Sequence, residues 1–80
     1  MAKGQKLPTL TAKDLVRVVL ADGWFRVPGT KHLAFKHPMK PGKVNIDEKW
    51  TAIRAGDRFF RSVLRQASLT RREFEDLYWE

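Results

Sequence analysis

The chain has 80 residues, with 16 Lys and Arg, 9 Asp and Glu and no cysteine, and its formal net charge is +7. This length predicts a single domain over residues 1–80 with a modest core. The lack of cysteine excludes a disulfide framework and a cysteine-held zinc site. No apolar stretch is long enough for a membrane span or fits a secretory signal, so we expect a cytoplasmic protein without membrane contact.

The charge is distributed unevenly along the chain. All 16 bases and five of the acids lie within residues 1–72, whereas the last eight residues hold four acids and no base. A basic body favours a polyanionic partner, because each Lys or Arg placed near a phosphate releases condensed counterions. Charge therefore points to nucleic acid as a partner.

The first predicted element is a helix. Residues 1–9 have the polar composition of a flexible tail. Thr11 then provides an N-cap with Asp14 as the capping-box acid, and apolar residues follow at helical spacing. Gly23 ends this helix.

Three short segments of alternating residues follow, separated by turns rich in proline and glycine. They predict strands over residues 24–27, 31–37 and 43–47. In the middle strand one face carries Leu33, Phe35 and His37, and the other carries His32, Ala34 and Lys36. Because Leu33 and Phe35 mark the core face, we expect His32 on the opposite, accessible face. The same alternation places His37 among packed residues at the strand end.

Two helices complete the chain. Residues 48–57 form a connection, and apolar residues recur at helical spacing from Phe59 to Ala67. Thr70 and Glu73 repeat the capping-box signal and begin a short helix from Arg71 to Tyr78. The fold class is therefore α+β: a helix, a three-stranded antiparallel sheet, a second helix and a short terminal helix.

Three blocks of this sequence resemble a known family. The segment Lys31-His32-Leu33-Ala34-Phe35-Lys36-His37-Pro38 resembles the Gly-Ser-His-x-x-Phe/Tyr-Arg-His-Pro signature of the HicA toxins. Gly23-Trp24 looks like the Gly-Phe of that family. Residues 61–74 are similar to its closing Arg-Ser-Ile-Leu-Arg-Gln-Ala-Gly-Leu-Ser-x-x-Glu-Phe, with Ser68 in place of the glycine. The similarity predicts a HicA-like domain over residues 11–79.

The resemblance implies a fold like that of a double-stranded-RNA-binding domain. It also implies a toxin of a type II toxin–antitoxin system, an mRNA interferase that cleaves message with one histidine, and a HicB-like antitoxin as its partner. His32 matches the histidine of the signature. The Gly-Ser that precedes it in the family is Thr30-Lys31 here.

The residues around His32 suit cleavage by the 2′-hydroxyl of the RNA itself. Imidazole can act as base or acid near neutral pH, and nearby cations can neutralise a phosphate. The predicted RNA-binding residues are Lys31, Lys36, Arg26, Lys40 and Lys43. The two histidines face different ways and no Cys or carboxylate completes a ligand set, so we expect no metal site and no cofactor.

Other interpretations stay open. The altered residues before His32 are compatible with a non-catalytic RNA-binding module on the same fold. A third possibility is a protein whose basic face mainly holds an acidic partner. The arginines of the last two helices, among them Arg58, Arg61 and Arg65, are interpreted as the solvated sides of amphipathic helices.

Overall fold

The computed structural model describes residues 7–28 and 31–80. It confirms the predicted α+β class and the predicted order of elements. Of the predicted tail, residues 1–6 lie outside the described residues, and Leu7 is partly buried against the core. The elements are α1 (Ala12–Ala21), β1 (Phe25–Val27), β2 (Leu33–Lys36), β3 (Val44–Ile46), α2 (Arg58–Ala67) and α3 (Arg71–Tyr78).

Capping boxes start the first and last helices, as predicted. The backbone N–H of Asp14 donates to the Thr11 hydroxyl, and the Asp14 carboxylate accepts from the Thr11 N–H. Thr70 and Glu73 make the same reciprocal pair at the start of α3. Each box satisfies backbone donors that a helix start would otherwise leave unpaired.

A left-handed residue separates α2 from α3. Ser68 is the C-cap of α2 and has φ 55° and ψ 44°. This is the conformation that glycine adopts most readily, because a Cβ atom is unfavourable there. The glycine of the HicA pattern at this position would fit the same backbone.

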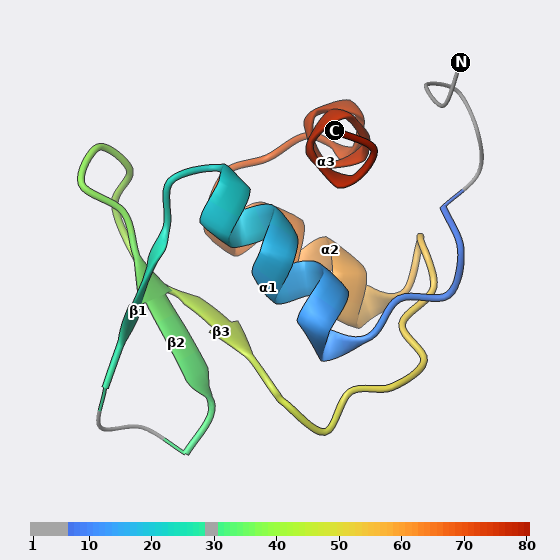
Figure 1. Cartoon of the computed structure of the whole chain (residues 1–80), viewed down its shortest axis with the longest axis horizontal. Coiled ribbons are helices and arrows are strands. Elements are labelled where there is room, and N and C mark those ends of the chain that lie inside the picture. Colours follow the sequence, from blue (N-terminus) through green and yellow to red (C-terminus); the bar gives the residue numbers. More distant parts are fainter. Residues whose placement is uncertain (1–6, 29–30) are drawn as a thin grey trace.

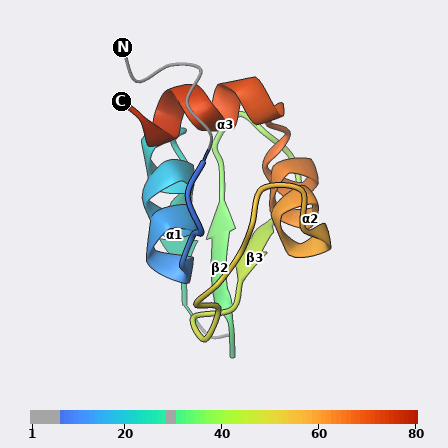
Figure 2. The same cartoon turned by 90° about the vertical axis from the view of Figure 1, so that its right-hand side faces the viewer.

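The three strands form one antiparallel sheet in the order β1-β2-β3. The helices lie on one face of this sheet, with α1 and α2 side by side in the same direction (Figures 1 and 2). The short α3 crosses the carboxyl-terminal ends of both (Figure 2). Among residues 7–28 and 31–80, no helix lies on the opposite face of the sheet (Figure 1). The molecule therefore has two layers, and its core lies between them.

Aromatic rings occupy the centre of this core. Phe35 of β2, Phe60 of α2 and Phe74 of α3 are almost completely buried. The rings of Phe60 and Phe74 meet edge to face, with centroids 5.0 Å apart. This contact packs α3 against α2.

The connection between β3 and α2 is tied to the residues that precede α1. Leu10 and Ile53 exchange two backbone hydrogen bonds of 2.7 and 2.8 Å, and the Ala12 N–H donates to the Trp50 carbonyl oxygen at 2.9 Å. The Trp50 ring in turn packs on Phe59, with centroids 5.1 Å apart. These contacts hold the connection between β3 and α2 at Trp50 and Ile53, although it lies outside the helices and strands.

A lysine joins the carboxyl-terminal ends of α1 and α2. The Lys40 ammonium donates to the carboxylate of Asp22 at 2.6 Å and to the carbonyl oxygen of Ala67 at 3.0 Å. Asp22 is the C-cap of α1, and Ala67 is the last residue of α2. The ends of two parallel helices carry partial negative charge, so a cation between them is stabilising.

His37 orders the same end of the molecule. Its Nδ1 accepts from the backbone N–H groups of Met39 and Lys40 at 2.9 and 3.2 Å. Its Nε2 lies 2.9 Å from the carbonyl oxygen of Asp22. Since Nδ1 accepts, the proton is on Nε2, which donates to that oxygen. This bears out the prediction that His37 packs and hydrogen-bonds at the end of the strand.

We expect Lys40→Met to lower the free energy of unfolding by about 1–2 kcal/mol, because the half-buried Asp22 carboxylate would lose its cation. For a domain of this size the midpoint Tm falls by roughly 5–15 °C, which thermal unfolding followed by circular dichroism measures. The exposed Lys36 provides the control, since Lys36→Met should change stability by less than about 0.5 kcal/mol. Equal Tm values for the two variants would contradict this role of Lys40.

Among residues 7–28 and 31–80, no helix combines the length and apolar character needed to cross a membrane.

Candidate functional site

His32 lies just before β2, beside the residue that follows β3. Its side chain is 57% exposed, and its Nδ1 lies 4.0 Å from the Asp47 carboxylate. The register of the sheet explains this approach: Leu33 pairs with Ile46, so the next pair outward is His32 and Asp47. The ring is therefore both accessible and next to a negative charge.

Backbone hydrogen bonds hold the Asp47 carboxylate in place. Its Oδ1 accepts from the Lys49 N–H at 2.9 Å, and its own carbonyl oxygen accepts from the Trp50 N–H at 3.0 Å. A turn thus begins at Asp47, and the other carboxylate oxygen is directed toward His32. Asp47 was not among the site residues predicted from the sequence. Only the register of residues 31–37 against residues 43–47 brings Asp47 to His32, and the turn between them does not define that register.

Two of the predicted RNA-binding lysines share the face of His32. Lys36 stands four residues further along the same strand, on the helix-free face, and is exposed. Lys43 precedes β3 and continues the alternation of the exposed Asn45. Lys31 is exposed beside His32. Three ammonium groups can therefore reach a polyanion that lies along this face.

Arg26 does not share this face. It pairs with Phe35, so both side chains leave the sheet on the side that the helices cover. Arg26 stays exposed because β1 is an edge strand. The alternation in the sequence could have predicted this side for Arg26, because Arg26 is two residues from the buried Trp24.

Lys40 is also separated from His32. Its ammonium is neutralised by Asp22 and satisfied by Ala67, so its charge is occupied within the fold. These contacts give Lys40 a structural role, and its predicted RNA contact stays a prediction.

Three arginines gather along the exposed side of α2. Arg58, Arg61 and Arg65 line a shallow hollow with Phe59 and Ser62. No hydrogen bond or ion pair of these guanidinium groups is seen within the described part of the chain. In α3, Arg71 pairs with Glu75 at 3.1 Å, four residues along the helix. These arginines form solvated helix faces.

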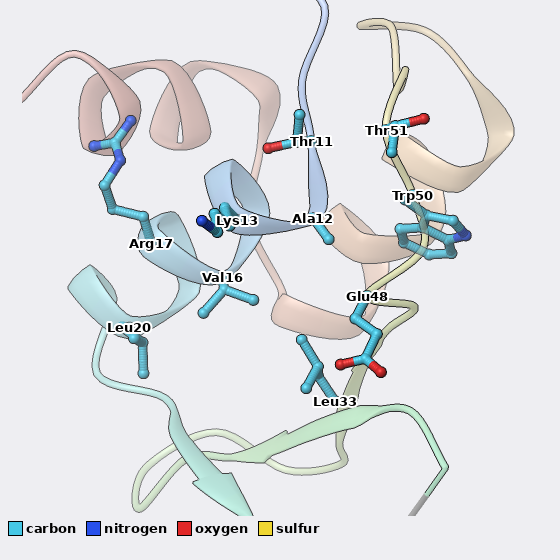
Figure 3. A pocket seen from close by; sticks show the side chains of 10 residues that line it. All are labelled: Thr11, Ala12, Lys13, Val16, Arg17, Leu20, Leu33, Glu48, Trp50 and Thr51. Carbon is cyan, nitrogen blue, oxygen red and sulfur yellow. The ribbon is translucent and has the colours of Figure 1, made fainter.

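An apolar groove of about 750 Å³ lies on the helix side of the sheet. Figure 3 shows Val16 and Leu20 of α1 directed toward Leu33, with Trp50 closing the other end. Leu20 is 49% exposed, and Lys13, Arg17 and Glu48 stand at the rim. His32 does not line this groove.

Within residues 7–28 and 31–80, no three His, Cys, Asp or Glu side chains lie together in a way that could hold a metal ion. The groups that can act on a bound molecule at the His32 face are one imidazole, one carboxylate and the lysine ammonium groups. This set can move a proton and neutralise a phosphate.

Comparisons with family models, with characterised proteins and with solved structures find no match to this chain. The likeness to HicA therefore rests on the three sequence blocks.

Proposed function

We propose that this protein is an endoribonuclease that cleaves mRNA without a metal ion, the toxin of a toxin–antitoxin pair similar to HicA. The observation that carries the proposal is the pair of His32 and Asp47, 4.0 Å apart on a sheet face that also bears Lys36. An accessible imidazole beside a fixed carboxylate suits proton transfer. The lysines suit a phosphate substrate.

The reaction uses the nucleophile that RNA itself provides. The 2′-hydroxyl oxygen attacks the adjacent phosphorus and gives up its proton, and the bond from phosphorus to the 5′-oxygen breaks as that oxygen gains a proton. The products are a 2′,3′-cyclic phosphate and a 5′-hydroxyl end. His32 performs one of the two proton transfers, and water at this open face performs the other. Asp47 stabilises the imidazolium form of His32 while it holds the proton.

The lysines act on the charge of the phosphate. Negative charge grows on the non-bridging oxygens as the phosphorus becomes five-coordinate, and ammonium groups stabilise it. Lys31 precedes His32 in the chain, and Lys36 lies further along the same strand, where it can bind a neighbouring phosphate; both are exposed. One histidine assisted by lysines gives a modest rate, which suits a toxin that acts on abundant message in the cytoplasm.

A HicB-like antitoxin belongs to the same proposal. Its support is the similarity of residues 61–74 to the closing block of the toxin family, together with the net charge of +7. An acidic protein is complementary to such a surface.

The proposal is tested with purified protein and a transcribed message in buffer that contains a chelator. We expect fragments that end in 2′,3′-cyclic phosphate, and no cleavage where the attacking 2′-hydroxyl is replaced by hydrogen. Salt-sensitive binding with the message left intact would favour the non-catalytic RNA-binding module instead. Cleavage that stops when the chelator is added would contradict the metal-independent reaction.

A further inference from the structure

The helix-free face of the sheet carries an exposed aromatic ring. Phe25 and Val27 of β1 leave the sheet on this side, as do Ala34 and Lys36 of β2, because each cross-strand pair shares a face. Phe25 is 48% exposed. It pairs directly with Lys36, so a flat ring and an ammonium group lie next to each other.

The residue at the centre of this face is small. Ala34, the middle residue between Val27 and Asn45, has only a methyl group and is 1% exposed. It is absent from the buried cluster that the helices cover, which agrees with its position on the other side of the sheet. The middle strand therefore contributes a methyl group at the centre of this face and the flexible Lys36 side chain beside the ring.

The charges of this face indicate which kind of ligand it binds. Lys36 and Lys43 lie near the Phe25 end, and the register extended beyond β3 makes them neighbours across the sheet. An apolar ring beside two ammonium groups is complementary to a nucleotide, which offers a flat base and a negative phosphate. A protein segment would have to cover two lysine charges that have no acidic partner among the described residues to reach the same ring.

We infer that Phe25 is a base-stacking subsite and that the bound RNA is single-stranded. The inference rests on the proposed function for its ligand, and it adds which form of RNA binds and where. Bases in a duplex are already stacked on their neighbours, so the Phe25 ring is accessible only to an unpaired base. His32 stands four residues from Lys36 along β2, about 13 Å away, and a few nucleotides of single strand cover this distance. A base held at Phe25 thus fixes the position of the bond presented to His32.

The test measures binding without cleavage. A fluorescently labelled single-stranded RNA with 2′-O-methyl groups cannot be cleaved, and its anisotropy reports binding by the wild-type protein and its variants. We expect Phe25→Ala to weaken binding by about 5- to 100-fold and Phe25→Trp to preserve it, because a single base stacked on an aromatic ring contributes that much. The same oligonucleotide paired with its complement should bind more weakly than the single strand.

The matched control is the other exposed phenylalanine, Phe59, which is 40% exposed on α2 beside the arginine hollow. Phe59→Ala should bind as the wild type does, and circular dichroism checks that each variant is folded. Wild-type affinity in folded Phe25→Ala, or a preference for the duplex, would overturn the subsite and leave the nuclease proposal intact. Absence of any RNA binding by the wild type would overturn both.

Discussion

Replacing His32 with alanine is expected to lower the rate of RNA cleavage by about 100-fold or more and to leave the fold intact. A proton transfer in the transition state is lost, whereas the lysines that bind the phosphate stay in place. The side chain is 57% exposed, so the free energy of unfolding should change by less than about 0.5 kcal/mol. Expression of both proteins in a bacterial host, with growth and the integrity of a reporter message followed, measures the effect.

Asp47→Asn is expected to lower the rate of cleavage less than His32→Ala does. Asparagine keeps the oxygen that accepts from the Lys49 N–H, so the turn remains, but the negative charge beside His32 is lost. Because a pair of this exposure contributes about 0.2–1 kcal/mol, cleavage should fall by at most about 5-fold.

Growth arrest by a folded His32→Ala protein would refute the catalytic role of His32.

Gly23→Ala is expected to lower the free energy of unfolding by about 2–4 kcal/mol, because two costs add at this position. Gly23 has φ +102°, a conformation that residues with a Cβ rarely adopt. A Cβ built there would lie 2.8 Å from Nε2 of His37, so the ring would have to move away from the Asp22 carbonyl oxygen. Urea unfolding followed by tryptophan fluorescence measures the loss.

Gly42 separates the two costs. It has φ +82°, and a Cβ built there meets nothing within 4 Å. Gly42→Ala therefore carries the backbone cost alone, about 1–2 kcal/mol. If the two alanine variants were equally stable, contact with His37 would contribute nothing, and the requirement for glycine at position 23 would lie only in the backbone.

The helices could be predicted because their start signals are local. Thr11 with Asp14, and Thr70 with Glu73, are three residues apart, and hydrogen bonds at that separation depend little on the rest of the fold. The two faces of β2 could also be predicted, because alternation alone places Leu33 and Phe35 opposite Lys36. The same alternation predicted that His32 is accessible, and its side chain is 57% exposed.

Contacts between distant segments could not be predicted in this way. The Lys40 ammonium reaches Asp22, 18 positions away, and Ala67, 27 positions away. Nothing near Lys40 in the sequence distinguishes it from Lys36 or Lys43, so it was grouped with them as an RNA contact. The approach of Asp47 to His32 also depends on strand register, which the length of a turn rich in proline and glycine does not define.

The hydrogen bond of the Asn45 N–H limits how this sheet can pair with strands of other chains. That N–H points away from β2 and donates to the side-chain oxygen of Gln66 on α2 at 2.7 Å. A fourth strand cannot add to β3 without displacing this amide. Of the two outer strands, β1 is the one left to pair with another molecule, and its three residues offer only a short ladder. Edge-to-edge aggregation of the folded domain is therefore blocked on one side by a glutamine and limited on the other by strand length.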